Sequence, residues 1–263
     1  MIVIIGDSWS CGEWSGSSQV GTASNISHTG LQQYLLDYQY PVINLGRGGD
    51  SNFGSYLRLQ DFLKSGILQY TEKITHVLYF QTEWHRDYNP IYGMPNLSMP
   101  NLSHPQNTWT FPETPNSIHE INDLTTSTIR NWQYRLVDLA QQYKFQIGLI
   151  GGTADTIWID KFAQEYPGLE ILCQSMTNLC INDTHRIDKP VYHVNEQLIN
   201  QFKTSLKDIE DIKELLTDMD SILVRRTQWQ IHQKYFWPDG IHPNRLAHKK
   251  LFDFIMDSGF FKN

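Results

Sequence analysis

The first eight residues of the chain, MIVIIGDS (1–8), carry the clearest indication of its fold. Five apolar residues, most of them β-branched, run without a break up to Gly6, which is typical of a central strand in a parallel sheet that is buried on both faces. Asp7 and Ser8 follow this run directly. We therefore expect Ser8 to lie at a sharp turn at the carboxyl edge of the sheet, where α/β proteins form their ligand sites.

The same kind of short apolar run returns further along the chain, at 41–45, 76–81, 145–150 and, as an expected edge strand, 169–173. Apolar residues at helical spacing lie between and after these runs and predict helices at about 29–39, 55–65, 118–143, 193–217 and 245–257. Strands that alternate with helices are typical of an α/β fold, in which a parallel sheet is covered by helices on both faces. No stretch has the composition of a linker, so residues 1–263 are expected to form one domain.

One stretch does not fit the alternation of strands and helices. Residues 88–117 are rich in Pro, Asn and Ser, and the pentapeptide MPNLS occurs there twice in tandem, at 94–98 and 99–103. This composition predicts a long surface loop inserted into the domain, and long ordered loops are often functional. Two interpretations stay open: the loop covers a site or contacts a partner, or it is a tolerated insertion without a role.

Composition and charge exclude several kinds of partner. The formal net charge is -7 and the basic residues form no cluster, so no nucleic-acid partner is expected. No run approaches the roughly 20 apolar residues of a membrane span, and the start of the chain lacks the features of a signal peptide. We therefore expect a cytoplasmic protein that binds no membrane. No His, Cys or Asp cluster has metal-ligand spacing and no nucleotide-binding glycine motif is complete, so neither a metal nor a cofactor is expected.

The three cysteines, Cys11, Cys173 and Cys180, are an odd number without metal-ligand spacing, and this favours reduced thiols over a disulfide framework. Cys11 lies three residues after Ser8 and is, by position, a rival nucleophile. The interpretation that we prefer for Cys11 is a small buried packing residue.

The far end of the chain carries the other half of a candidate active site. A serine hydroxyl is a poor nucleophile until a histidine, itself oriented by a carboxylate, takes its proton. The segment PDGIHPN (238–244) supplies such a pair, since Asp239 and His242 stand three residues apart, directly before the last predicted helix. This spacing can place the carboxylate against one imidazole nitrogen and leave the other facing Ser8. Either block alone is more often a plain turn or a helix cap, but the two together favour a serine nucleophile.

In this order, and over nearly the whole chain, the blocks resemble those of the SGNH, or GDSL-type, serine hydrolases. The first block, GDS at 6–8, implies Ser8 as the nucleophile and its amide as a donor of the oxyanion hole. The last block implies Asp239 and His242 as the activating pair. The resemblance also implies the fold of the family, a three-layer α/β/α sandwich whose central parallel sheet has the flavodoxin-like strand order.

The resemblance implies the rest of the oxyanion hole less completely. The segment VINLGRGGDS (42–51) matches the second block of the family and implies Gly49 as a backbone donor, because a glycine lets the amide approach the developing charge. The third block of the family normally supplies an asparagine donor, but here the third strand leads into QTEW (81–84) and Glu83 falls at that position. An ionised glutamate would repel an oxyanion. The alternatives that stay open are Glu83 in its protonated form and the side chains of Gln81, Thr82, Asn52 and Arg86.

Tryptophans flank three of the predicted site loops. Trp9 adjoins the nucleophile, Trp84 follows the third strand, and Trp237 lies just before the Asp–His pair. Tryptophan rings can stack on sugar faces or hold an acyl chain, so these three are candidate substrate-binding residues. The alternative for each of them is ordinary packing in the core or at the rim.

These observations predict a serine esterase that cleaves a small ester through a Ser-His-Asp triad, with an O-acetyl group on a carbohydrate as the expected substrate. The partner is then a small-molecule or glycan ester, and an oligomer or a larger assembly stays open. The alternative is a scaffold of the same fold with weak or no catalysis, serving as a glycan-binding or virion-associated structural protein. The third block and the 88–117 loop favour this alternative, while the intact set of Ser8, Asp239 and His242 speaks against it.

Overall fold

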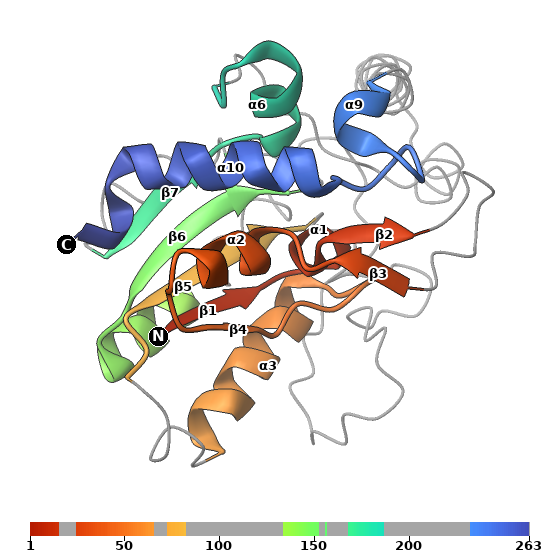
Figure 1. The fold of residues 1–263 in the computed structure, drawn as a ribbon. Helices are drawn as coiled ribbons and strands as arrows, with labels where there is room; N and C mark the ends of the chain where they lie inside the picture. Colours follow the sequence, from red (N-terminus) through yellow and green to blue (C-terminus); the bar gives the residue numbers. More distant parts are fainter. Residues whose placement is uncertain are drawn as a thin grey trace, which may run out of the picture.

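A parallel sheet of five strands forms the centre of the computed structural model, which describes residues 1–15, 25–65, 73–82, 134–152, 156, 168–186 and 232–262. Along the chain its strands are β1 (Ile2–Ile5), β4 (Val42–Asn44), β5 (His76–Gln81), β6 (Gln146–Gly151) and β7 (Leu169–Cys173). They lie in the order β4-β1-β5-β6-β7, and all neighbours are parallel (Figure 1). This is the predicted flavodoxin-like order, with β7 at the edge.

The strands are apolar along their length because both faces of the sheet are covered. Alternate side chains of a strand point to opposite faces, so Val3 of β1 packs into one core and Ile4 into the other. Strand β5 divides in the same way, with Tyr79 in the first core and Phe80 in the second. A strand that is buried on both faces has an unbroken apolar sequence rather than an alternating one, which explains the pattern at 1–5.

One face of the sheet is covered by α3 (Asn52–Lys64) and by a helix at 134–143. Both helices contribute buried side chains to the same core: Phe53, Tyr56, Leu57, Leu59, Leu63, Leu136, Val137, Leu139 and Ala140. Helix α3 begins earlier than its apolar pattern predicts because Ser51 caps it, with its Oγ accepting a hydrogen bond from the amide of Gly54 at 3.0 Å. The helix predicted at 118–143 is described from residue 134 on.

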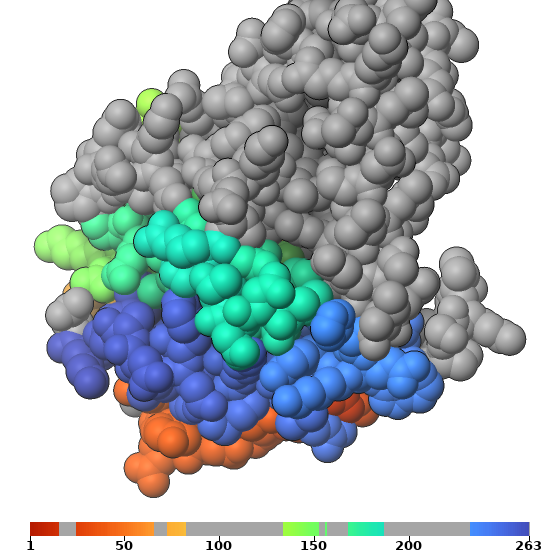
Figure 2. All heavy atoms as spheres, turned by 90° about the horizontal axis from the view of Figure 1, so that it is seen from above, coloured from red at the N-terminus to blue at the C-terminus, as the bar shows by residue number. Residues whose placement is uncertain are grey.

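The opposite face is covered by α2 (Leu31–Asp37) and α10 (Arg245–Ser258), together with α6 (Met176–Asn182), α9 (Gln233–Phe236) and the 3-10 helix η4 (Phe260–Lys262). Helix α10 contacts both α2 and α6, and Figure 2 shows its blue side chains between those two helices. Helices on both faces of the sheet confirm the predicted three-layer α/β/α sandwich and the helices expected at 29–39 and 245–257.

A small hairpin, which the sequence analysis does not predict, lies beyond the carboxyl edge of β1 (Figure 1). The chain leaves β1, forms one helical turn, α1 (Ser8–Cys11), and enters β2 (Glu13–Ser15), which pairs antiparallel with β3 (Asn25–His28). Glu13 and Trp14 of β2 have different partners, Arg245 for Glu13 and Ser8 for Trp14, and both matter for the site.

Several of the predicted features lie outside the described residues. They are the loop at 88–117, the helix at 193–217, and the residues Glu83, Trp84 and Arg86. The arrangement of 1–263 as a single domain stays a prediction. Within the described ranges, no helix has both the length and the apolar character that crossing a membrane requires.

Candidate active site

Ser8 is held at the carboxyl edge of the sheet by a turn that requires glycine. Gly6 has a φ of +142°, and a Cβ atom on it would stand 2.6 Å from the Cβ of Phe80 on the neighbouring strand β5. Asp7 then caps α1, its Oδ1 accepting a hydrogen bond from the amide of Trp9 at 3.0 Å. Ser8 is therefore the first residue of α1, and only 7% of its surface is exposed.

His242 lies between Ser8 and Asp239 and contacts both. Its Nε2 is 2.9 Å from the Oγ of Ser8, and its Nδ1 is 2.5 Å from the Oδ2 of Asp239. With the imidazole proton on Nδ1, the ring donates to the carboxylate and accepts from the serine hydroxyl. The hydroxyl, the base and the group that orients the base form one chain of hydrogen bonds across 234 residues of sequence. The structure thus brings together the three residues that the sequence predicts as a triad.

A tight turn presents the carboxylate of Asp239 to the imidazole. Its Oδ1 accepts hydrogen bonds from the amides of Ile241 at 2.9 Å and His242 at 2.8 Å, which leaves Oδ2 for the ring. Burial raises the pKa of Asp239, but the hydrogen bond and charge of the His242 ring, with the two amides, outweigh burial and bring the pKa below its ordinary value. Asp239 is therefore an ionised carboxylate at neutral pH and can stabilise a protonated imidazole.

Asn244 fixes the segment that follows His242. The amide of Asn244 donates to the carbonyl of Tyr235 at 2.8 Å, and its side-chain Nδ2 donates to the carbonyl of Lys234 at 2.8 Å. Its Oδ1 accepts two amides from the first turn of α10 and so caps that helix. The turn that carries the Asp–His pair is therefore fastened to both α9 and α10.

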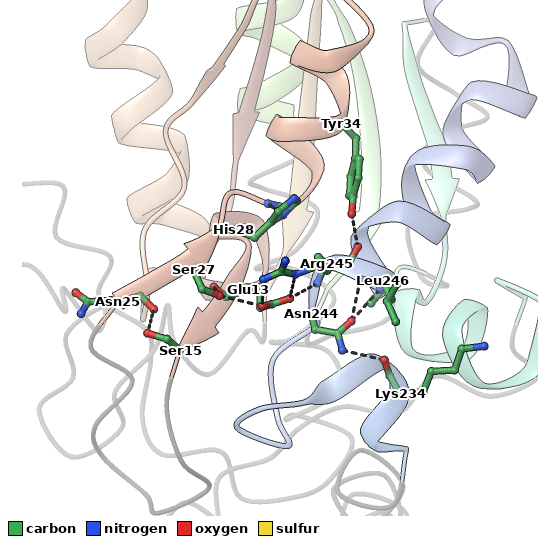
Figure 3. Close-up of polar contacts among 12 residues, drawn as sticks. Glu13, Ser15, Asn25, Ser27, His28, Tyr34, Lys234, Asn244, Arg245 and Leu246 are labelled. Carbon is green, nitrogen blue, oxygen red and sulfur yellow. Dashed lines mark hydrogen bonds and ion pairs between the residues drawn. The ribbon is translucent and has the colours of Figure 1, made fainter.

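An ion pair makes a second connection between the two ends of the chain (Figure 3). Arg245 donates to the carboxylate of Glu13 from its backbone amide at 2.7 Å, from Nε at 2.9 Å and from Nη2 at 2.8 Å. The hydroxyl of Ser27 donates to the same carboxylate at 2.9 Å. The hydrogen bond from the Arg245 side chain, more than any other influence, lowers the pKa of Glu13 from 4.5 to about 2, against the effect of burial. The pair fixes the β2–β3 hairpin to the first turn of α10, three residues after His242.

The two backbone amides that are candidate oxyanion donors lie in adjacent loops. Ser8 is the first residue of α1, so its amide has no acceptor within that helix. Gly49 lies in the exposed loop after β4 with a φ of +76°, and a Cβ atom on it would meet nothing within 4 Å. Glycine is therefore needed there for the backbone conformation rather than for space. The preceding Gly48 lies next to Ser8, since a Cβ atom on it would stand 4.0 Å from the Cβ of Ser8.

Thr82 and Asn52 use their polar groups on each other and on Asp7. The amide of Thr82 donates to the Oδ1 of Asn52 at 3.0 Å, and the Nδ2 of Asn52 donates to the carbonyl of Thr82 at 3.0 Å. The hydroxyl of Thr82 donates to the Oδ2 of Asp7 at 2.9 Å. The structure therefore gives no support to Thr82 or Asn52 as the replacement for the missing asparagine donor. These residues instead tie together the exits of β1 and β5 and the start of α3.

The tryptophans expected to bind substrate differ in position. Trp9 has no exposed surface and packs in the core with its ring centroid 6.0 Å from that of Phe236. This corrects the expectation for Trp9, because a fully buried side chain packs the helix layer and cannot reach a ligand. Trp237 is 55% exposed beside the turn that carries Asp239, so it can meet a ligand. Trp84 lies outside the described residues.

Trp14 is a site residue that the sequence analysis does not identify. Its Nε1 donates to the carbonyl of Ser8 at 2.9 Å, and the centroid of its ring is 5.6 Å from that of His242. The chain contains eight tryptophans, and nothing in the local sequence distinguishes this one. Only a prediction of the β2–β3 hairpin could have placed it beside the nucleophile.

The three cysteines are buried thiols, as expected for packing residues. Burial raises the pKa of Cys11 and of Cys180 to about 12, so both thiols stay protonated and unreactive. Cys11 is therefore no rival to Ser8. Within the described ranges, no group of three or more His, Cys, Asp or Glu side chains is placed to hold a metal ion.

No family model matches the sequence, and no curated protein matches it significantly. Several solved structures have a backbone that follows a similar path. The psychrotrophic esterase EstA from Pseudoalteromonas sp. is 13% identical, with a TM-score of 0.47 over 100% of this chain and 98% of that chain. A protein described as a GDSL-like lipase from Parabacteroides merdae is 14% identical, with a TM-score of 0.39 over 98% and 94% of the two chains.

A variant of Axe2, an acetyl xylan esterase from Geobacillus stearothermophilus, is 14% identical to this chain. Its TM-score is 0.35, over 97% of this chain and 92% of that chain. Likeness of this degree carries no argument about activity. The chemistry of this chain has to be argued from its own residues.

Proposed function

We propose that this protein is a serine ester hydrolase, with Ser8 as nucleophile, His242 as general base and acid, and Asp239 as the carboxylate that orients the histidine. The observation that carries the proposal is the unbroken contact from the Oγ of Ser8 through both nitrogens of His242 to Asp239. The hydroxyl of Ser10, two residues further on, donates to the carbonyl of Asp7 in its own turn at 2.6 Å. The hydroxyl of Ser8 instead meets a base from the other end of the chain.

In the acylation step, Nε2 of His242 takes the proton of Ser8 while Oγ bonds to the carbonyl carbon of the ester. The charge that develops on the carbonyl oxygen is stabilised by the amides of Ser8 and Gly49. The imidazolium, held by Asp239, gives its proton to the leaving alcohol as the C–O bond breaks, and an acyl group remains on Ser8. Water then attacks this acyl group with the same nitrogen as base, the acid leaves, and Ser8 regains its proton. Ester and water thus become alcohol and acid.

The substrate that we propose is a small ester, an O-acetyl group on a carbohydrate. Trp237 is 55% exposed beside the turn that carries the Asp–His pair, and an exposed indole can stack on the apolar face of a sugar. Ile241, which adjoins His242, is 44% exposed and adds apolar surface. The sugar would lie on this side of the site, because the imidazole has to reach the oxygen of the leaving alcohol.

The test compares hydrolysis of p-nitrophenyl acetate by the wild type and by Ser8→Ala. We expect the rate to fall on the order of 10⁴-fold or more in Ser8→Ala, because no other group takes over the nucleophile's role. A fluorophosphonate probe, which needs an activated serine, is expected to label the wild type and not the variant. A wild type that is folded by circular dichroism but no faster than Ser8→Ala would favour the scaffold without catalysis.

Substitution of Glu83 tests whether this residue occupies the position of the third oxyanion donor. If Glu83 stands where the family has its asparagine, Glu83→Asn is expected to raise the rate by up to about 10²-fold, because a hydrogen-bond donor replaces a repelling charge. Glu83→Gln is the matched control, since it removes the charge but places the amide differently. An unchanged rate in both variants would show that Glu83 is not part of the oxyanion hole.

A further inference from the structure

Trp14 contacts three loops of the candidate site, although it belongs to none of the blocks that predict that site. Its Nε1 donates to the carbonyl of Ser8 at 2.9 Å. Its ring centroid is 5.6 Å from that of His242, with the two planes inclined by 40°. A Cβ atom on Gly48 would stand 3.0 Å from its Cη2, so the indole lies against the loop that carries Gly49. One side chain therefore touches the nucleophile, the base and the oxyanion loop.

The residue before Trp14 fixes the hairpin to the last helix. Glu13 binds Arg245 through three hydrogen bonds of 2.7 to 2.9 Å. The start of β2 is thus fastened to α10, the helix that begins three residues after His242. Trp14 and the imidazole that it contacts are consequently carried by two elements fixed to each other.

We propose that Trp14 is a positioning residue of the esterase site, which orients the imidazole of His242 and stabilises its protonated form through the indole ring. The inference rests on the proposed function. An aromatic ring attracts a cation that lies over its face within about 6 Å of the centroid, whereas its edge does not. In the mechanism, His242 takes up its proton on attack and keeps it until the alcohol leaves. The indole therefore favours the tetrahedral intermediate over the ground state, as catalysis requires.

This role makes the effect of Trp14 depend on the leaving group. Both esters need the imidazolium during the attack of Ser8, but a sugar alcohol also has to receive its proton as it departs, whereas p-nitrophenolate can leave without one. Trp14→Leu is therefore expected to lower kcat/KM about 10- to 30-fold for an acetylated methyl glycoside, and about threefold or less for p-nitrophenyl acetate. A smaller folded fraction would lower both values by the same factor. The ratio of the two values thus separates positioning of the base from a purely structural role.

Matched variants show which part of the indole acts. Trp14→Phe keeps an aromatic ring beside His242 but cannot donate to the carbonyl of Ser8, and it is expected to return the ratio to within about threefold of the wild type. Ser15→Ala removes the 2.9 Å hydrogen bond to the carbonyl of Asn25 in the same hairpin, and both rates are expected to stay unchanged. Thermal unfolding of each variant is measured first, and Trp14→Met replaces Trp14→Leu if the latter does not fold.

The inference is overturned if the ratio of the two kcat/KM values, glycoside ester over p-nitrophenyl acetate, is the same in the non-aromatic variant as in the wild type. A ratio in Trp14→Phe as low as in the non-aromatic variant also overturns it, because the ring would then contribute nothing. The proposed function fails separately, and the inference with it, if wild type and Ser8→Ala hydrolyse both esters at the same rate. Hydrolysis that depends on Ser8, with an unchanged ratio, removes only the role of Trp14.

Discussion

Among the contacts that join residues 1–15 of the chain to its last helix and the turn before it, two differ in kind. His242 meets Ser8 through one hydrogen bond of 2.9 Å, whose proton has to move in the proposed reaction. Arg245 meets Glu13 through three hydrogen bonds of 2.7 to 2.9 Å, none of which changes in that reaction. The fold thus places a fixed connection beside a reactive one. The comparison suggests that the reactive hydrogen bond can be single because its neighbour keeps the two segments in place.

The energies of the two contacts are expected to differ as well. The side chain of Arg245 is 52% exposed, so solvent screens its attraction to Glu13 and limits what the pair contributes to stability. The pair mainly fixes the position of the hairpin relative to α10, because a guanidinium fork and a backbone amide hold one carboxylate from several directions. The contact at His242 adds little to stability, and its value lies in proton transfer.

The largest effect is expected from breaking the reactive contact alone. Asp239→Asn keeps an acceptor for the two backbone amides but loses the charge that orients and stabilises the imidazole. We expect kcat for p-nitrophenyl acetate to fall about 10³- to 10⁴-fold. The melting temperature should stay close to that of the wild type, because Glu13 and Arg245 remain paired. A fall in kcat of less than about tenfold would remove Asp239 from the mechanism.

The reverse result is expected when the fixed contact is weakened. Glu13→Gln removes the charge that receives the guanidinium, and we expect the free energy of unfolding to fall by about 1–2 kcal/mol. The value of kcat/KM should fall less than about tenfold, since the triad itself is intact. Denaturant unfolding measures the first quantity and ester hydrolysis the second. A large loss of activity without a loss of stability would contradict the division of roles, and Arg245→Lys is the control that keeps the charge but not the fork.

The smallest effect concerns pH and the same ion pair. Folding lowers the pKa of Glu13 from 4.5 to about 2, so its contribution to stability is present above the unfolded value and lost as pH falls towards the folded value. The difference in unfolding free energy between wild type and Glu13→Gln is therefore expected to be constant above about pH 5 and to shrink as pH falls further. Asp239 is present in both proteins and cancels in this difference. A difference independent of pH would contradict the lowered pKa.

The strands and the contact of His242 with Ser8 and Asp239 could be predicted from the sequence because their signals are local. A strand buried on both faces is an unbroken apolar run, and β5 begins and ends where the run at 76–81 does. Ser8 follows such a strand, and Asp239 and His242 share one short turn. The resemblance to the SGNH hydrolases also implied the three-layer architecture, which the structure confirms.

The hairpin and the contacts that it makes could not be predicted in the same way. Strands β2 and β3 are short and mixed in polarity, so no periodicity marks them. Glu13 and Arg245 are 232 residues apart, and such a pair leaves no local pattern. Of the two roles open for Trp9, the structure shows core packing, because adjacency in sequence to Ser8 does not mean adjacency in space to a ligand. Ser8 reaches the histidine while the next side chain points into the core.

The arrangement of the triad also bears on protein synthesis. Ser8 leaves the ribosome long before Asp239 and His242 are translated. A nascent chain that stops before residue 239 therefore carries an ordinary serine, which has no base to activate it. In the proposed esterase, activity begins only after α10 (Arg245–Ser258) has been translated and has docked against α2 and α6. Only molecules that have been translated past this helix and have folded, so that Ser8 meets His242, would therefore hydrolyse ester.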